Sequence, residues 1–163
     1  MLDEENPIVT SKQLEPCIKG GNVGLLTDAG CPNIADPGAK LILHAHENNI
    51  NVIPLVGPSS ILLAMMSSGL NGNNFSFNGY LPIDKNDRSK KIKKLEIESK
   101  NNNQSQIFIE TPYRNQVLFE ELKKNLNNNT FLCVAKSIGS TNQKIKTIRE
   151  NELKNTRDTH QNT

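Results

Sequence analysis

The sequence predicts an α/β protein with two domains, at residues 1–74 and 75–163, and two observations carry this prediction. First, short apolar segments alternate with helical patterns between residues 23 and 68, with short links between them. Strand, helix, strand, helix in this order is typical of a parallel sheet with right-handed crossovers. Second, an Asn- and Gly-rich segment at 71–78 breaks this rhythm, so we place the domain boundary there.

The first domain is expected to contain two strands and two helices. Its first strand is followed by a crowded loop, and the Pro54 inside the second strand indicates an edge, a bulge or a strand end. The last helix, SSILLAMMSS, is apolar almost all round and is therefore expected to be buried. The predicted elements are a strand at 23–27, a helix at 39–49, a strand at 51–56 and a helix from Ser59 or Ser60 to Ser68.

The second domain is expected to alternate helices and strands of mixed direction. A basic helix at 87–99 places Ile92 and Leu95 inward, and a helix at 115–126 repeats leucine every four residues. Strands are predicted at 106–111, 130–136 and 144–149.

Composition narrows the protein class without naming a function. The net charge of the 163 residues is +2, which favours neither a nucleic acid nor a membrane. The three cysteines, Cys17, Cys31 and Cys133, have no paired or metal-binding spacing, so we expect free thiols, a cytoplasmic location and no metal. No apolar run reaches the roughly 18 residues needed to span a bilayer, and the acidic start does not resemble a signal peptide.

The segment GLLTDAGCPNIADPG, residues 24–38, is the most informative part of the chain. Its Gly and Pro residues fix a non-repeating backbone path between a predicted strand and a helix. A loop of this kind at the carboxyl end of a buried strand is where α/β proteins place ligands. An ordinary connection built from turn residues is the alternative.

Four motifs occur in order: TDAGCPNIADPG at 27–38, VGPSSI at 56–61, GYLP at 79–82 and ETPYR at 110–114. Together they resemble the tetrapyrrole-methylase superfamily of S-adenosylmethionine-dependent methyltransferases. Within it, the chain resembles the branch that methylates a cytidine ribose 2′-hydroxyl in small-subunit (16S) ribosomal RNA. The resemblance implies a homodimer of two-domain chains, each holding S-adenosyl-L-methionine between its domains.

The resemblance also implies which residues form the site. For the cofactor it implies Ala29, Gly30, Cys31, Ile34, Ser59, Ser60, Glu110 and Thr111. For the RNA substrate the matched motifs suggest Asp36, Tyr113 and Arg114, and the basic segment at 85–94 adds Lys90 and Lys91. A helix start at Ser59–Ser60 suits the carboxylate of a methionine tail, although simple capping explains two serines equally well.

The catalytic base is not assigned. Asp36 has a second interpretation as the cap of the helix at Ala39, and Glu110 with Arg114 has a second interpretation as a structural ion pair.

The chain departs from the family pattern at three positions and at both ends. Cys31 stands in place of Thr, Ala35 in place of Ser and Tyr113 in place of His. The family's first strand with its Pro/Gly loop, and its last strand, have no counterpart, so we expect an incomplete first sheet and a shortened chain. The alternatives are methylation of a tetrapyrrole or another small molecule, and an inactive shortened homologue.

The segment from Lys85 to Lys94 carries six basic residues. It has two interpretations, a grip on RNA phosphates or a solvated helix face. The GxGxG turn of common dinucleotide-binding folds is absent from the sequence, which argues against those enzymes.

Overall fold

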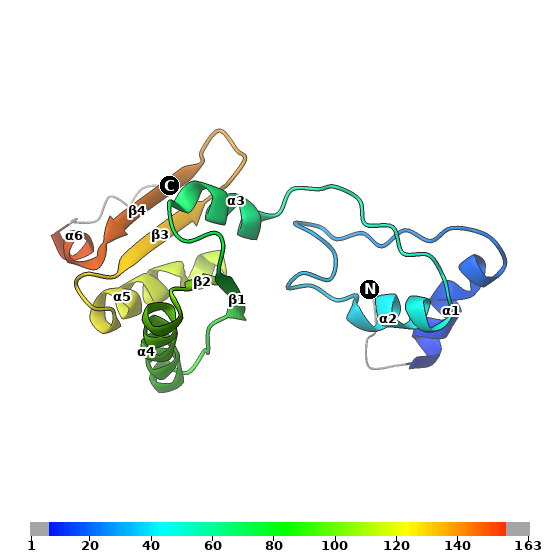
Figure 1. The fold of residues 1–163 in the computed structure, drawn as a ribbon, viewed down its shortest axis with the longest axis horizontal. Coiled ribbons are helices and arrows are strands. Elements are labelled where there is room, and N and C mark those ends of the chain that lie inside the picture. The colour runs from blue at the N-terminus through cyan, green and yellow to red at the C-terminus, as the bar shows by residue number, and fades with distance from the viewer. Residues whose placement is uncertain (1–6, 156–163) are drawn as a thin grey trace. The chain divides into compact units, whose positions relative to one another are not determined.

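The computed structural model describes residues 7–155 (Figure 1). The chain divides into two compact units, Met1–Ser59 and Ser60–Thr163, which we call the N-terminal and C-terminal units. The predicted α/β class is confirmed at the level of helices combined with one parallel and one antiparallel strand pair. The family domain boundary between residues 74 and 75 stays a prediction.

The N-terminal unit contains two helices, α1 (Pro7–Ile18) and α2 (Ala39–Glu47). They pack through buried Leu14, Leu41 and Ala45, each no more than 8% exposed. The predicted helix at 39–49 is therefore confirmed, whereas α1 was not predicted. Pro7 begins α1, where its missing N–H has no helical partner to lose.

The predicted strands at 23–27 and 51–56 are wrong, because residues 7–59 contain no strand. A strand forms only where a neighbour accepts and donates its backbone hydrogen bonds, and neither segment has such a neighbour in the described unit. Leu25 and Val52 still pack against the helices. The parallel sheet expected for the first domain is thus not found in the described residues.

The C-terminal unit begins with α3 (Ser60–Ser68), followed by strand β1 (Phe75–Tyr80). A long crossover helix, α4 (Lys85–Asn102), leads to β2 (Ser105–Ile109), which pairs parallel to β1 with Phe75 opposite Ser105. The remaining elements are the short 3₁₀ helix η1 (Pro112–Arg114), α5 (Asn115–Asn125), the antiparallel pair β3 (Phe131–Lys136) and β4 (Lys144–Arg149), and α6 (Glu150–Asn155).

Apolar residues of α4 and α5 form the core of this unit, and the two helices pack against each other (Figure 1). Ile92 and Leu95 are 2% and 3% exposed, which confirms that they face inward. The core consists of Leu81, Ile92, Leu95, Leu118 and Leu122, with Phe108, Leu126 and Leu132 packed against it. The helices and strands predicted for residues 87–149 are all confirmed within a few residues, and β1 was not predicted.

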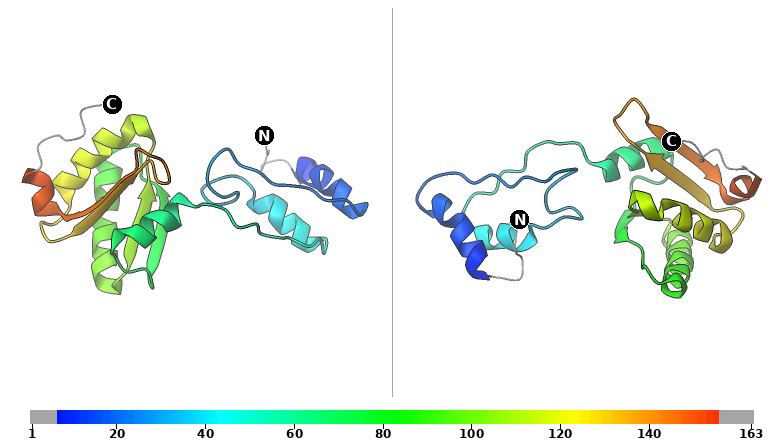
Figure 2. Two further views of the ribbon diagram at one scale, coloured as in Figure 1. Left: turned by 90° about the horizontal axis from the view of Figure 1, so that it is seen from above. Right: turned by 180° about the vertical axis from the view of Figure 1, so that it is seen from behind.

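Helix α3 packs on the β3–β4 pair, as Figure 2 shows. The Thr147 hydroxyl donates to the Ser68 carbonyl at 2.6 Å. The prediction that this helix is buried is wrong, because Leu62 and Met66 are 52% and 79% exposed. The pattern is apolar all round, but in the described C-terminal unit only one side of the helix has a sheet to cover it.

Candidate functional site

The loop at residues 27–38 is rich in left-handed backbone conformations. Gly30, Asn33, Ala35 and Gly38 have positive φ angles of 76°, 66°, 57° and 150°. Gly and Asn tolerate such angles, whereas an L-residue such as Ala loses about 1 kcal/mol. Backbone strain of this kind gathers at functional sites, so the loop geometry is consistent with a ligand loop.

Cys31 ties this loop to the segment that precedes α3. Its thiol donates to the carbonyl oxygen of Pro58 across 3.6 Å. The Ile34 N–H donates to the Cys31 carbonyl at 3.2 Å, and the Thr27 hydroxyl donates to the Ala29 carbonyl at 3.3 Å. Two segments predicted to bind the cofactor, the one around Gly30 and the one before Ser59, are thereby brought together within the N-terminal unit.

The loop ends at Gly38, whose backbone is closely packed against other residues. A Cβ placed on Gly38 would lie 3.1 Å from Leu25 Cδ2 and 3.3 Å from Asn33 Cβ, so this position admits only glycine without rearrangement. Gly38 is also the N-cap of α2. The interpretation of Asp36 as the cap of this helix is therefore wrong, because a glycine occupies the N-cap position; Asp36 is exposed in the loop.

The other loop residues that are predicted to bind the cofactor are accessible. Ala29 and Gly30 are exposed, and the side chain of Ile34 is 50% exposed. Ser59 is the last residue of the N-terminal unit, and Ser60 is the first residue of α3. Their assignment to the cofactor stays a prediction.

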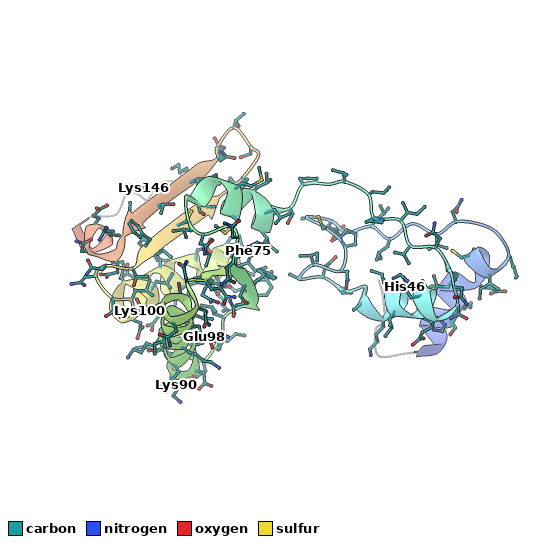
Figure 3. The ribbon with its side chains drawn as sticks, in the orientation of Figure 1. His46, Phe75, Lys90, Glu98, Lys100 and Lys146 are labelled. Atoms are coloured by element: carbon teal, nitrogen blue, oxygen red, sulfur yellow. The ribbon has the colours of Figure 1, made fainter. Side chains whose placement is uncertain are left out.

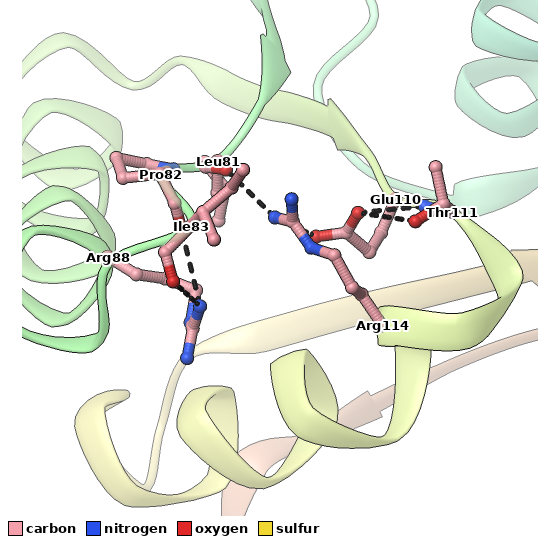
Figure 4. Close-up of polar contacts among 7 residues, drawn as sticks. All are labelled: Leu81, Pro82, Ile83, Arg88, Glu110, Thr111 and Arg114. Carbon is pink, nitrogen blue, oxygen red and sulfur yellow. Dashed lines mark hydrogen bonds and ion pairs between the residues drawn. The ribbon is translucent and has the colours of Figure 1, made fainter.

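In the C-terminal unit, Glu110 and Arg114 form a shielded ion pair (Figure 4). Arg114 Nη2 donates to Glu110 Oε2 at 2.6 Å and to the Leu81 carbonyl at 3.0 Å. The other carboxylate oxygen, Oε1, accepts from the Thr111 N–H at 2.8 Å and from its hydroxyl at 3.2 Å. The structural ion pair proposed from the sequence is confirmed, and both Glu110 oxygens are engaged in holding the protein itself.

Arg88 is a second buried arginine beside this pair. In the sequence it counts among the six basic residues of 85–94 that could grip RNA phosphates, but its side chain is turned inward. It is 6% exposed, and its Nη1 donates to the carbonyls of Ile83 at 2.8 Å and Pro82 at 3.3 Å (Figure 4). The two arginines together fix the backbone of residues 81–83. The spacing of Arg88, Ile92 and Leu95, four and three residues apart, is the signal that places Arg88 on the inward face of α4.

An open hollow of about 190 Å³ lies next to the two arginines. Its walls are Ile83, Arg88, Glu110, Arg114, Val117 and Leu118. The charged groups in these walls already hold backbone carbonyls or each other, so the hollow offers mostly apolar contact.

The other predicted substrate residues lie at the surface. Tyr113 on η1 is 82% exposed. Lys90 is exposed on α4, as Figure 3 shows, with its Nζ 3.6 Å from Asp87 Oδ1, and Lys91 is half-buried. These residues belong to the C-terminal unit, whereas the loop at 27–38 belongs to the N-terminal unit.

The structure offers no metal centre and no membrane helix in the part of the chain that it describes. Residues 7–155 contain no group of three or more His, Cys, Asp or Glu side chains placed to hold a metal ion. No helix among them combines the length and apolarity needed to cross a bilayer.

Known proteins resemble this chain in sequence. A ribosomal RNA small subunit methyltransferase I of Haemophilus influenzae is 30% identical over 145 residues, which cover 89% of this chain and 49% of the relative. Proteins of the same name from Synechocystis and Vibrio cholerae are 33% identical over 129 residues and 36% identical over 101 residues. These matches cover 79% and 62% of this chain and 45% and 34% of the relatives.

The chain is a distant homologue of the ribosomal RNA small subunit methyltransferases I. It spans about half the length of the curated methyltransferases I that it matches. No family model matches the chain. Among solved structures, the methyltransferase CobJ matches with a TM-score of 0.57 and 16% identity, over 88% of this chain and 63% of that one. This likeness supports the predicted tetrapyrrole-methylase-like fold.

Proposed function

We propose that this protein is an S-adenosyl-L-methionine-dependent methyltransferase that methylates a cytidine ribose 2′-hydroxyl in small-subunit ribosomal RNA. The observation that carries the proposal is the homology to methyltransferases I, which runs through the ordered motifs at 27–38, 56–61, 79–82 and 110–114. We also propose a cytoplasmic location, where ribosomal RNA is found, and a dimer of two chains, which the family resemblance implies.

The loop geometry fits a cofactor of this chemistry. The contact of Cys31 with Pro58 holds the exposed Gly30 backbone beside the segment that leads to Ser59. A Cβ on Gly30 would meet nothing within 4 Å, which leaves open space for a ligand to approach that backbone. For the cofactor we propose Ala29, Gly30, Cys31, Ile34 and Ser59 of this unit. The motif match also implies Ser60, Glu110 and Thr111, which belong to the C-terminal unit.

S-adenosyl-L-methionine supplies the methyl group, on a sulfonium, for an in-line displacement by the ribose oxygen. The task of the protein in such a reaction is to hold that oxygen in line and to exclude water. Both Glu110 oxygens are engaged with Thr111 and Arg114, so we assign Glu110 to positioning the end of β2 rather than to removing the ribose proton.

Calorimetric titration of the 163-residue chain with S-adenosyl-L-methionine tests the cofactor. We expect a Kd in the micromolar range, which corresponds to about −8 kcal/mol. Gly30→Val fills the open approach and is expected to weaken binding at least tenfold. Gly20→Val is the matched control, because Gly20 lies in the same unit outside the proposed site, has a similar positive φ of 86° and also has open space around its Cβ position. Absence of heat with the unchanged chain would favour an inactive homologue.

Primer extension on ribosomal RNA tests the substrate. At low nucleotide concentration, reverse transcriptase stops at a 2′-O-methylated ribose. We expect such a stop in RNA from cells that carry the gene and its loss after deletion. An unchanged pattern, together with cofactor binding, would redirect the proposal to a tetrapyrrole or another small molecule.

A further inference from the structure

The β3–β4 hairpin carries a concentrated positive charge. Residues 131–149 include Lys136, Lys144, Lys146 and Arg149 and no Asp or Glu. Four positive charges in this segment exceed the net charge of the whole chain, which is +2. The next acid along the chain, Glu150, is 0% exposed, so its carboxylate does not lie on this surface.

The three lysines share one face of the hairpin. In the antiparallel register Lys136 lies opposite Lys144, and Lys146 lies opposite Val134. Residues two apart on one strand, and residues directly opposite on the next, project from the same face of a sheet. Lys136, Lys144 and Lys146 are all exposed, and Figure 3 marks Lys146 on this hairpin. We call these three residues the lysine face.

The lysine face has no acidic counterpart. Among the described residues, no ion pair joins any of the three lysines to a carboxylate, whereas Lys90 and Lys94 on α4 pair with Asp87 and Glu98 at 3.6 and 3.7 Å. Like charges directly opposite in a sheet destabilise it. An exposed cluster of like charges without carboxylate partners is suited to a polyanionic partner.

The loop that connects the two strands is ordered by its own hydrogen bonds. The Ser140 N–H donates to the Ser137 carbonyl at 3.1 Å, and the Gly139 N–H donates to Gln143 Oε1 at 2.8 Å. The loop has the sequence SIGSTNQ, so its side chains are uncharged, and several of them can donate or accept hydrogen bonds. Such a surface suits a ribose–phosphate backbone, with lysines for the phosphates and hydroxyls or amides for the sugars.

We propose that the lysine face binds the phosphate backbone of the RNA substrate, and that it contributes more to this binding than the basic helix α4. The proposal rests on RNA being the substrate class of the proposed function. Each phosphate contact made by a lysine releases condensed counterions. For single-stranded RNA, three contacts correspond to a slope of about −2 in a plot of log binding constant against log salt concentration.

The test compares two triple variants of the full chain. The first, K136Q/K144Q/K146Q, removes the lysine face, and the control, K93Q/K94Q/K100Q, removes the same charge from α4. Binding of fluorescent poly(U) RNA is measured at several salt concentrations, with polyglutamate as a second polyanion and circular dichroism to check folding. We expect the first variant to bind at least tenfold more weakly, with a salt slope shallower by about 2, and the control to lose less than half of that slope.

Three outcomes would overturn the proposal: equal losses in both triple variants, equally tight binding of polyglutamate, or no RNA binding by the unchanged chain. Titration with S-adenosyl-L-methionine is a separate readout on the same samples. A chain that binds RNA through the lysine face but gives no heat with that cofactor would contradict methyl transfer and leave the RNA surface supported.

Discussion

Arg114 and Glu110 are joined by a 2.6 Å contact in which the carboxylate side chain is only 4% exposed. The same guanidinium donates to the Leu81 carbonyl, so a single side chain connects the end of β2 to the segment that follows β1. This pair belongs to the ETPYR motif, and its geometry assigns that motif a role in holding the C-terminal unit together.

Arg114→Met is expected to destabilise the C-terminal unit by about 3 kcal/mol, because it leaves a buried carboxylate and a carbonyl without their partner. Urea unfolding followed by tyrosine fluorescence measures this unit alone, since both tyrosines, Tyr80 and Tyr113, lie in it and the chain has no Trp. Lys94→Met, which breaks an exposed pair with Glu98, is the control and should cost less than about 1 kcal/mol. Equal effects of the two substitutions would contradict a structural role for Arg114.

Three glycine-to-alanine substitutions separate backbone strain from crowding in the N-terminal unit. Gly38→Ala introduces both strain and crowding, because φ is 150° and Leu25 Cδ2 lies 3.1 Å from the added Cβ. Gly30→Ala introduces only the strain of a φ of 76°. Gly24→Ala introduces neither strain nor crowding. We expect the free energy of unfolding to fall most for Gly38→Ala, by about 1 kcal/mol or less for Gly30→Ala, and hardly at all for Gly24→Ala. Hydrogen exchange of peptides that cover residues 25–45 measures the order, and a larger effect at Gly30 than at Gly38 would contradict it.

Asp84 gives the C-terminal unit a pH dependence that can be measured. Its carboxylate accepts from the backbone N–H groups of Asp87 and Asn86 at the start of α4. The Asp87 bond is the main reason that the pKa of Asp84 lies below its ordinary value of 3.8. A lowered pKa in the folded state stabilises the fold above the unfolded value, and this stabilisation disappears as the pH falls through the folded value.

Asp84→Ala is therefore expected to lower the melting temperature at pH 7, and the difference from the unchanged protein should shrink below pH 3.8. Asp84→Asn keeps an acceptor for the same N–H groups and should retain most of the stability at neutral pH. Thermal melts at pH 7 and at pH 3 measure both effects. A pH-independent difference would show that the carboxylate charge has no part in the cap.

Lys144→Glu tests the opposed lysines of the hairpin by stability rather than by binding. Because the introduced carboxylate would face Lys136 directly, the substitution replaces a repulsion with an attraction of about 0.2–1 kcal/mol. The melting temperature should rise at low salt, and the gain should diminish at high salt. Lys144→Gln, which only removes the repulsion, should give a smaller gain.

The helices and the later strands could be predicted from the sequence because their signals are local. Ile92 and Leu95 lie on one face of a helix by spacing alone, and the same spacing applied to Arg88 identifies a buried cation. Strand β1 was missed because FSFNGY combines three residues that favour strands, Phe75, Phe77 and Tyr80, with Asn and Gly, which do not.

The predictions of strands at 23–27 and 51–56 were wrong for the opposite reason. Their apolar composition favours strands, but a strand is a property of two segments, and composition says nothing about whether a partner is present. The contact between Cys31 and Pro58 was likewise beyond local reasoning, because it joins residues 27 positions apart. Sequence motifs selected the candidate residues of the site, and the structure supplied which of them each unit holds together.

The hydrogen bond from Thr147 to Ser68 joins residues 79 positions apart, near the two ends of the C-terminal unit. Contacts between such distant residues form late, because the entropy of closing a long loop must be overcome first. During synthesis, helix α3 leaves the ribosome long before β4, the strand that will cover one of its sides. Until β4 emerges, the apolar SILLAMM segment on the nascent chain therefore lacks the strand that will cover one of its sides, and exposed apolar segments of this kind favour aggregation.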